Sequence, residues 1–323
     1  MTVRLALFGS LLVAAAAAGL LLLRSPHAAS SGQAGRISPR TATPAPAPSE
    51  PHEWAHLAPE SLRLRSAYAL VLDQGSDRVL YAKAPQAITP IASITKLMSA
   101  MVLLDARLPM DVPVTVTDDD VDVLRGSLSK LPVGWTLTRA DLLHLALMAS
   151  ENRAAHALAR TYPGGVDAFV AAMNAKAREL GMAATHYADP TGLNNENVST
   201  ARDLAALVKA AYGYETIRRM TTSDRYEVRS LSSGRARLFG NSNGLVRDPQ
   251  WTIGLSKTGF INDSGFCLVM QTIIHNRPVI LVLLDSVGKL SRIGDAERIR
   301  RWLESGPELA LYVRRHASGH AGA

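Results

Sequence analysis

The chain is poor in cysteine, because Cys267 is the one cysteine among its 323 residues. One thiol cannot close an intramolecular disulfide, and it cannot supply a C-x-x-C metal or redox motif. The apolar neighbours Phe266 and Leu268–Met270 indicate a strand, so Cys267 is interpreted as a small core residue. There is no H-E-x-x-H motif, and His144 and His156 are too far apart for an H-x-x-x-H pair. These absences argue against a disulfide-stapled domain and against a zinc hydrolase.

Aromatic residues are also few, at 5%, and no run of basic residues alternates with aromatic ones, although the formal net charge is +7. This pattern argues against a nucleic-acid partner. The surplus positive charge fits either scattered arginines that keep the chain soluble or an anionic partner such as lipid or a wall polymer. With 47% hydrophobic residues, the chain can bury a sizeable core as one large domain or two closely packed lobes.

The residue pattern at the N-terminus is typical of an export signal. An uncharged run rich in Ala and Leu extends from Leu5 to Leu23 between Arg4 and Arg24, and small residues follow, with a candidate cleavage site after Ser30. The run is longer than the usual signal core of about 7–15 residues and close to the ~20 residues that span a bilayer. Two interpretations therefore remain: a signal peptide that is cleaved, and a membrane anchor that is retained. Either one predicts export, and export without a disulfide fits the periplasm of a bacterial envelope.

A single folded domain is predicted between two irregular segments. Residues 1–30 form the signal peptide or anchor, residues 31–61 a linker rich in Pro and Ala, and residues 307–323 a tail. The fold class expected for residues 62–306 is α+β, an antiparallel sheet flanked by helices. Its sheet part covers about 62–113 and 213–306, and a mainly helical subdomain is inserted at about 114–212. The predicted strands are 67–73, 78–82, 251–257, 265–275 and 277–285, and the predicted helices include 93–101, 139–150, 152–160, 166–180 and 296–304.

The segment Pro90–Met101, PIASITKLMSAM, is almost wholly apolar and yet contains a lysine. On a helix, Ser93 and Lys96 are three residues apart and share one face. A serine hydroxyl needs a base to become a nucleophile, and burial lowers the pKa of a lysine so that it can act as that base. The segment therefore predicts a serine nucleophile with a lysine base. The alternative is an ordinary amphipathic helix whose lysine reaches water.

Two further short motifs carry polar groups suited to a substrate peptide. Ser150 and Asn152 lie between two predicted helices, where a hydroxyl can relay a proton and an amide can both donate to and accept from a peptide group. Lys257, Thr258 and Gly259 end a predicted strand, where glycine lets a substrate backbone approach and the other two can bind a carboxylate. The alternatives are a helix N-cap for the first motif and a solvated strand end for the second.

The ordered set S-x-x-K, S-x-N and K-T-G resembles the signature of penicillin-binding proteins and serine β-lactamases. Residues 67–306 resemble the low-molecular-mass penicillin-binding proteins, the serine D-alanyl-D-alanine peptidases, and are most similar to their endopeptidase members. This implies a β-lactamase/transpeptidase-like fold. The stretches that carry the resemblance are 90–107, 145–154, 162–165, 173–177, 190–193, 197–204 and 257–260.

The resemblance implies a serine acyl-enzyme mechanism without metal or cofactor. The catalytic residues would be Ser93, Lys96 and Ser150. The substrate-binding residues would be Asn152, Lys257, Thr258, Gly259 and Phe260, with backbone N–H groups of Ser93 and Phe260 as the oxyanion hole. The implied partners are a peptidoglycan peptide as substrate and β-lactam antibiotics as covalent inhibitors, with membrane association through the N-terminal segment as an open point.

Several activities remain open within and beyond this resemblance. The endopeptidase members cut the bond between D-alanine and meso-diaminopimelate, whereas carboxypeptidase members trim the terminal D-alanine. The segment Asn241–Leu245 lacks the charged residue that some carboxypeptidases place between its two asparagines, which favours the endopeptidase. A β-lactamase would need a second base, and neither Glu151 nor Glu196 lies in an E-x-x-L-N pattern. A wall-peptide-binding module without catalysis is the non-enzymatic alternative.

Overall fold

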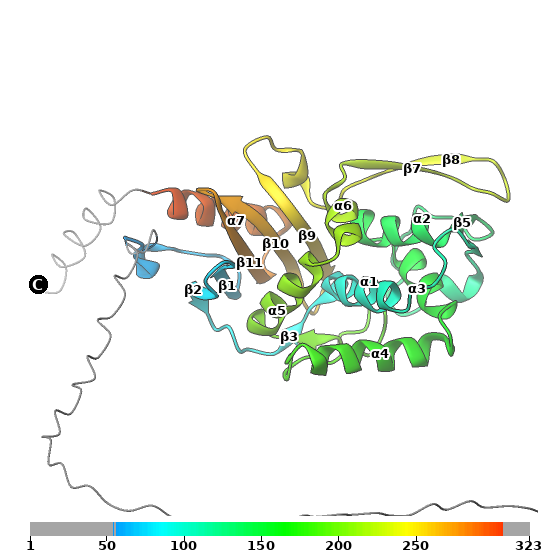
Figure 1. Cartoon of the computed structure of the whole chain (residues 1–323), viewed down its shortest axis with the longest axis horizontal. Helices are drawn as coiled ribbons and strands as arrows, with labels where there is room; N and C mark the ends of the chain where they lie inside the picture. Colours follow the sequence, from blue (N-terminus) through cyan, green and yellow to red (C-terminus); the bar gives the residue numbers. More distant parts are fainter. Residues whose placement is uncertain (1–53, 55, 306–323) are drawn as a thin grey trace, which may run out of the picture. The chain divides into compact units, whose positions relative to one another are not determined.

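A five-stranded antiparallel sheet is the central feature of the computed structural model, which describes Trp54 and residues 56–305 (Figure 1). The predicted signal or anchor, most of the linker and the tail lie outside the described residues. The strand order is β2-β1-β11-β10-β9, so the first strands of the domain pair with the last. The strands are β1 (Tyr68–Asp73), β2 (Arg78–Lys83), β9 (Thr252–Ile261), β10 (Gly265–Ile274) and β11 (Arg277–Ser286).

Tight turns fix the register of two of the hairpins within the sheet. Between β1 and β2, the carboxylate of Asp73 accepts hydrogen bonds from the backbone N–H groups of Gly75 and Ser76. Between β10 and β11, His275 and Asn276 both have positive φ values, 50° and 59°. Two successive residues with positive φ form the turn whose twist matches that of a β-hairpin. The predicted turn at Asn276 is confirmed.

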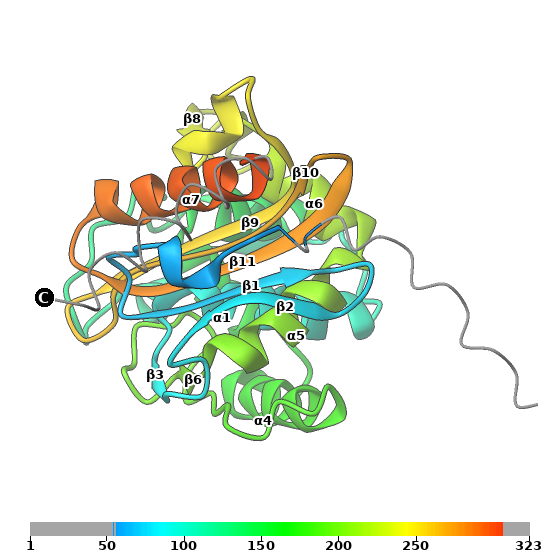
Figure 2. The same ribbon diagram turned by 90° about the vertical axis from the view of Figure 1, so that its left-hand side faces the viewer.

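The alternation of side chains along β11 places apolar residues on both faces of the sheet. Ile280, Val282 and Leu284 join one core cluster, and the intervening Leu281 and Leu283 join the other. Helices α5 (Ala201–Tyr212) and α7 (Lys289–Glu304) cover the opposite faces, as Figure 2 shows. The predicted α+β class with helices flanking an antiparallel sheet is therefore confirmed.

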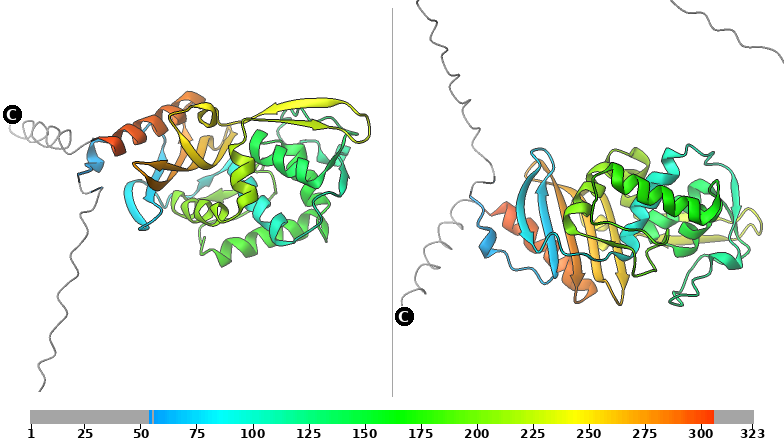
Figure 3. Two further views of the ribbon diagram at one scale, coloured as in Figure 1. Left: turned by 45° about the horizontal axis from the view of Figure 1, so that its top comes forward. Right: turned by 90° about the horizontal axis from the view of Figure 1, so that it is seen from below.

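Helix α1 (Thr95–Asp105) is the central helix of the helical part, which lies beside β9 (Figure 3). Nine of its eleven residues are buried. It contacts the three helices α3 (Asn152–Arg160), α4 (Gly165–Glu179) and α5. A helix that is apolar around its whole circumference has to be buried on all sides. The prediction of a buried central helix is confirmed, but the α-helix begins at Thr95 and does not include Ser93 as predicted.

Some predicted boundaries differ from the structure. The strand predicted to end at Lys257 continues to Ile261 as β9, because its pairing with β10 extends to Gly265. The helix predicted from Ala296 begins at Lys289, where charged residues in the first turns hide the apolar pattern. The predicted helix 139–150 ends its regular part at His144 and continues as a π-helical turn.

The remaining elements connect the sheet and the helical part. They are β3 (Thr89–Pro90), β4 (Pro113–Thr115), β5 (Thr136–Thr138), α2 (Arg139–His144), β6 (Val198–Ser199), α6 (Glu215–Thr222), β7 (Arg225–Arg229) and β8 (Ala236–Gly240). Strands β7 and β8 form a separate hairpin. Within residue 54 and residues 56–305, no helix is both long enough and apolar enough to cross a bilayer.

The packing of the sheet core leads to a prediction about the contribution of one buried side chain to the stability of the domain. Leu283 on β11 is fully buried between the sheet and α7. We expect Leu283→Ala to lower the free energy of unfolding by about 2–5 kcal/mol, because it removes apolar contacts and leaves a cavity. Val79→Ala on β2, where the side chain is 39% exposed, should lower it by less than about 1 kcal/mol. Urea unfolding of both variants is the measurement, and equal losses would contradict this account of the core.

Candidate active site

Ser93 and Lys96 meet where a 3-10 turn, Ala92–Ile94, leads into α1. Ser93 lies in this turn rather than in the α-helix, and Lys96 is the second residue of α1. The distance between Lys96 Nζ and Ser93 Oγ is 2.8 Å, and Lys96 is only 1% exposed. The structure thus brings the predicted hydroxyl and amine into direct contact, with the lysine buried rather than solvated.

The buried amine of Lys96 has two other oxygen partners. Its Nζ donates to Asn152 Oδ1 at 2.7 Å and to the backbone carbonyl oxygen of Thr191 at 2.6 Å. Burial lowers the pKa of Lys96 to about 7, although the negative charges of Asp189 and Glu151 act in the opposite direction. At neutral pH a large fraction of this amine is therefore uncharged and able to accept a proton.

A second hydroxyl–amine pair is formed by Ser150 and Lys257. Ser150 follows the π-helical turn in a left-handed conformation, with φ 63°, and precedes α3. Lys257 Nζ donates to Ser150 Oγ at 2.8 Å and to the carbonyl oxygen of Thr258 at 3.0 Å. Burial lowers the pKa of Lys257 well below its usual value, and the positive charges of Lys96 and Arg292 lower it further. A positive charge on Lys96 therefore disfavours the charged state of Lys257.

The side chain of Thr258 points to a third hydroxyl. Its Oγ1 donates to Ser242 Oγ at 2.8 Å, and the backbone N–H of Ser242 donates to the carbonyl oxygen of Met148. Ser242 lies in the segment after β8, so this contact links the third motif to the π-helical turn that precedes Ser150. Hydroxyl groups of this kind can donate to a carboxylate.

Two glycines allow the backbone around Ser93 to be enclosed closely. A Cβ atom on Gly259 would lie 2.9 Å from the carbonyl oxygen of Ile91, and one on Gly192 would lie 2.0 Å from that of Ala92. Gly192 also has φ +83°, which side chains disfavour. Ala92 itself has a positive φ of 46°. Ala92, the residue before Ser93, is thus packed between the loop around Gly192 and strand β9.

A cleft of about 400 Å³ lies above Ser93. Strand β9 is an edge strand of the sheet, so alternate backbone groups along it can pair with an added peptide. Phe260 is 49% exposed at the cleft and stacks on Phe266, with ring centroids 4.2 Å apart. The described residues that line the cleft are Ser93, Leu124, Arg125, Ser127, Asn152, Leu193, Phe260, Ile261 and Asn262.

Sequence reasoning missed three groups that contact the predicted residues. Ser127 Oγ accepts a hydrogen bond from Asn152 Nδ2 at 2.9 Å, the carbonyl of Thr191 binds Lys96, and Ser242 binds Thr258. Ser127 and Ser242 lie in irregular segments without periodicity, and a carbonyl oxygen carries no residue signal. The loop around Thr191 was indicated only by the family resemblance in residues 190–193, and by no other sequence pattern.

The other candidate residues have structural partners away from the cleft. Glu151 accepts hydrogen bonds from Ser129 Oγ and the backbone of Lys130, and Glu196 is exposed on a loop. His144 stacks on Tyr226 with ring centroids 3.8 Å apart.

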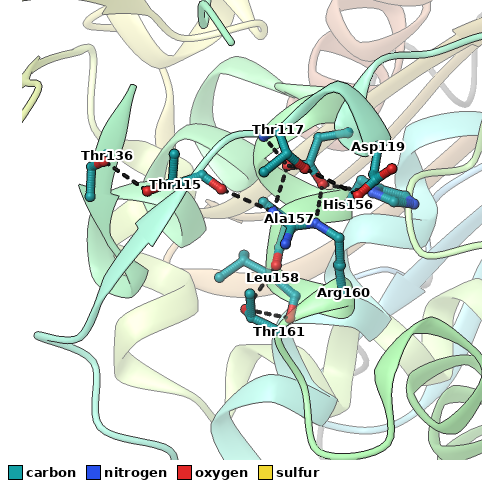
Figure 4. Close-up of polar contacts among 10 residues, drawn as sticks. Thr115, Thr117, Asp119, Thr136, His156, Ala157, Leu158, Arg160 and Thr161 are labelled. Atoms are coloured by element: carbon teal, nitrogen blue, oxygen red, sulfur yellow. Dashed lines mark hydrogen bonds and ion pairs between the residues drawn. The ribbon is translucent and has the colours of Figure 1, made fainter. Parts of the chain in front are cut away.

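His156 belongs to a buried carboxylate network, which Figure 4 shows. Its Nδ1 lies 2.8 Å from Asp120 Oδ1, and Arg160 Nη2 donates to Asp120 Oδ2 at 2.8 Å. Burial acts to raise the pKa of Asp120, but the hydrogen bonds from His156 and Arg160 outweigh it and hold this pKa at about 2. The network connects α3 to the segment that follows β4, so we assign it to stability.

Comparison with known proteins agrees with this geometry. The family model described as D-alanyl-D-alanine carboxypeptidase matches residues 55–288. The chain belongs to this family. Its members are serine peptidases, which confirms the resemblance inferred from the three motifs and places the protein among the penicillin-binding peptidases of bacteria.

Two curated members of the family are similar over most of their length. The D-alanyl-D-alanine endopeptidase of Pseudomonas aeruginosa is 48% identical over 253 residues, which cover 78% of this chain and 82% of that protein. The one of Escherichia coli is 46% identical over 244 residues, covering 75% and 78%. Among solved structures, the DD-transpeptidase of a Streptomyces strain has a TM-score of 0.70 at 28% identity, covering 75% of this chain and 97% of that one. The fold of the family is therefore also the fold of this chain.

The close packing at Gly192 generates a prediction with a matched control. Gly192 and Gly181 both have positive φ, but a Cβ on Gly181 would meet nothing within 4 Å. We expect Gly181→Ala to cost about 1–2 kcal/mol of stability from the backbone conformation alone. Gly192→Ala should cost at least ~3 kcal/mol, because the added methyl also displaces Ala92. Urea unfolding checks both values, and equal costs would show that the loop is not packed as described.

Proposed function

We propose that the protein is a peptidoglycan D-alanyl-D-alanine endopeptidase that hydrolyses the bond between D-alanine and meso-diaminopimelate through an acyl-enzyme on Ser93. The observation that carries the proposal is the 2.8 Å contact between Ser93 Oγ and the buried amine of Lys96, whose pKa is lowered to about 7 by burial. A serine beside a neutral amine, at the bottom of a cleft bordered by an edge strand, has what acyl transfer from a peptide requires.

In the proposed acylation step, Ser93 Oγ attacks the carbonyl carbon of the D-alanyl residue, and its proton passes to Lys96 Nζ. The substrate lies along the edge of β9. The carbonyl oxygen then becomes an oxyanion, which the backbone N–H groups of Ser93 and Phe260 would stabilise. Asn152 would hold the substrate amide with its Nδ2, while its Oδ1 keeps Lys96 in place.

In the proposed second half of acylation, the carbon–nitrogen bond breaks and the leaving amine takes a proton. Ser150 would deliver that proton with assistance from Lys257, 2.8 Å from Ser150 Oγ, and the proton that Lys96 took from Ser93 balances the one released. Thr258 and Lys257 would bind the carboxylate next to the new amine, and Gly259 would let the substrate backbone approach. Water then hydrolyses the ester and frees Ser93. A β-lactam would acylate the same oxygen.

A carboxypeptidase that trims the terminal D-alanine is the second candidate, favoured by the description of the family model. Both reactions release an amine with a carboxylate beside it, so the same groups would serve. The endopeptidase is placed first because the two relatives at 48% and 46% identity bear that name. It also requires room for a second peptide on the leaving side of the cleft.

We further propose that the protein acts in the periplasm. The support is the apolar run Leu5–Leu23 and the Pro- and Ala-rich segment that follows it, which would let the domain at 62–306 reach the wall from a membrane or after release. Its sheet and helical parts would divide at about residues 113 and 213. In the described structure, helix α5 of the predicted insertion packs on the sheet.

The proposed role of Lys96 as the base leads to a prediction about the pH dependence of acylation. A protonated amine cannot accept the serine proton, so the acylation rate of Ser93 by a fluorescent penicillin should fall about tenfold per pH unit below a pKa near 7 and level off above it. Lys96→Arg keeps the charge but cannot lose it, since the guanidinium pKa exceeds ~12. We expect a loss of roughly 10²–10⁴-fold. A flat pH profile between 5 and 9, together with an active arginine variant, would remove Lys96 as the base.

The bond that is cut can be determined by digesting purified, cross-linked wall fragments and analysing the products by mass. If the protein is an endopeptidase, dimeric muropeptides should disappear while monomeric pentapeptides stay intact. Tetrapeptides formed from monomeric pentapeptides would instead identify a carboxypeptidase. Ser93→Ala is the control and should neither digest the fragments nor be labelled by penicillin. Labelling of this variant would refute the assignment of the nucleophile.

A further inference from the structure

Arg125 lies in the wall of the catalytic cleft, and the proposed mechanism gives it no part. Of the described residues that line the cleft, it alone has a charged side chain. Its Nη2 lies 2.7 Å from Asp263 Oδ2, and its Nε donates to the carbonyl oxygen of Leu193. Its side chain remains 24% exposed. A guanidinium has five N–H donors in a fixed fork, so these two contacts leave donors for a ligand.

The direction of β9 tells on which side of the scissile bond Arg125 lies. Thr258, the proposed partner of the leaving-group carboxylate, precedes Gly259, which packs against the backbone next to Ser93. Asp263, the partner of Arg125, follows the last residue of β9. The cleft-lining residues 260–262 lie between Gly259 and Asp263 along the chain. Since a strand advances about 3.3 Å per residue, Thr258 and Asp263 lie on opposite sides of the residue that packs beside Ser93. Arg125 is therefore on the acyl side, next to the part of the substrate that stays bound to the serine.

A second cavity, of about 240 Å³, adjoins the acyl side and has the opposite charge. Leu124, Asn152 and Leu193 line both cavities. The described residues of the second cavity include no lysine or arginine. Asp120 in its lining is already paired with Arg160 and with His156, which also lines the cavity, so its negative charge comes from Asp119, Asp122 and Asp189. Asp119, labelled in Figure 4, is exposed. A ligand that extends from the cleft into this cavity therefore passes from a positive to a negative environment.

The proposed substrate carries such a pair of charges on its acyl side. The residue before the attacked D-alanine is itself a diaminopimelate, and the free end of its side chain bears a carboxylate and an ammonium on one carbon. We propose that Arg125 is a specificity-determining residue that binds this side-chain carboxylate, with the ammonium directed toward the acidic cavity. The proposal rests on the proposed function, and it holds for either bond, because the endopeptidase and the carboxypeptidase share the same acyl side.

A purely structural role of Arg125 is the rival explanation. The ion pair with Asp263 joins the segment around Arg125 to the turn after β9, and losing it could disturb the cleft for any substrate. The two explanations differ in what the variant Asp263→Asn does. It removes the ion pair but leaves the guanidinium, so a structural role predicts the same defect as in Arg125→Gln, and carboxylate binding does not.

The test uses two synthetic cross-linked peptides that differ only in the acyl-side diaminopimelate, whose side-chain carboxylate is either free or converted to the carboxamide. The measured quantity is the ratio of kcat/KM for the free acid to that for the amide. A general loss of activity lowers both values and leaves the ratio unchanged. A charge-assisted hydrogen bond to carboxylate predicts a ratio of about ten or more for the unaltered protein.

We expect Arg125→Gln to bring the ratio close to one, and Asp263→Asn to keep it within about threefold of the unaltered protein. Arg225→Gln on β7, which removes an exposed positive charge that lines neither cavity, should not change it. Equal rates for the two peptides, or the same fall in the ratio for Arg125→Gln and Asp263→Asn, would overturn the specificity role alone. If the unaltered protein hydrolyses neither cross-linked peptide, the endopeptidase proposal fails, and the ratio is measured on the matching pair of monomeric pentapeptides. Hydrolysis of neither pair would overturn the specificity role together with the proposed function.

Discussion

The site depends on burying the amine of Lys96 in an apolar helix and surrounding it with oxygen atoms. A buried ammonium without partners would cost several kcal/mol, and a fully solvated one would keep its ordinary pKa and could not act as a base near neutrality. The structure meets both constraints with three acceptors from three segments: Ser93, Asn152 and the carbonyl of Thr191. The central position of α1 therefore serves the chemistry as well as the packing.

One loop connects this amine to the backbone of Ser93, the proposed nucleophile. The carboxylate of Asp189 accepts hydrogen bonds from Thr191 Oγ1 and the backbone of Gly192, both at 2.7 Å. The side-chain amide of Asn197 donates to the carbonyl of Asp189 at 2.9 Å and to Thr95 Oγ1 at 3.0 Å. The same buried polar network thus sets the carbonyl that binds Lys96 and the glycine that packs against Ala92. Displacing this loop would therefore alter the surroundings of Lys96 and of Ser93 together.

The sequence predicted the reacting groups better than their surroundings. Ser93, Lys96, Ser150 and Lys257 were singled out because each lies in a short motif of unusual residue types, and the apolar run in 277–285 was correctly predicted as a strand. The carbonyl of Thr191, Ser127 and Arg125 were not found, because they act from irregular segments, through a backbone atom or across long sequence separations. The true length of β9 was also missed, since Gly259 weakens a strand pattern in the very place where the packing requires it.

The order of strands in the sheet has a consequence for the life of the chain before it is active. Strand β1 pairs with β11, where Leu70 lies opposite Val282. Strand β1 therefore has no partner on that side until almost the whole domain has been synthesised. Lys257 and the edge strand that carries it belong to the same late block. A chain that is still being synthesised can therefore contain Ser93 and Lys96 long before the cleft is assembled. Latency is thus built into the topology, because a partly synthesised domain still lacks the strand that borders the cleft.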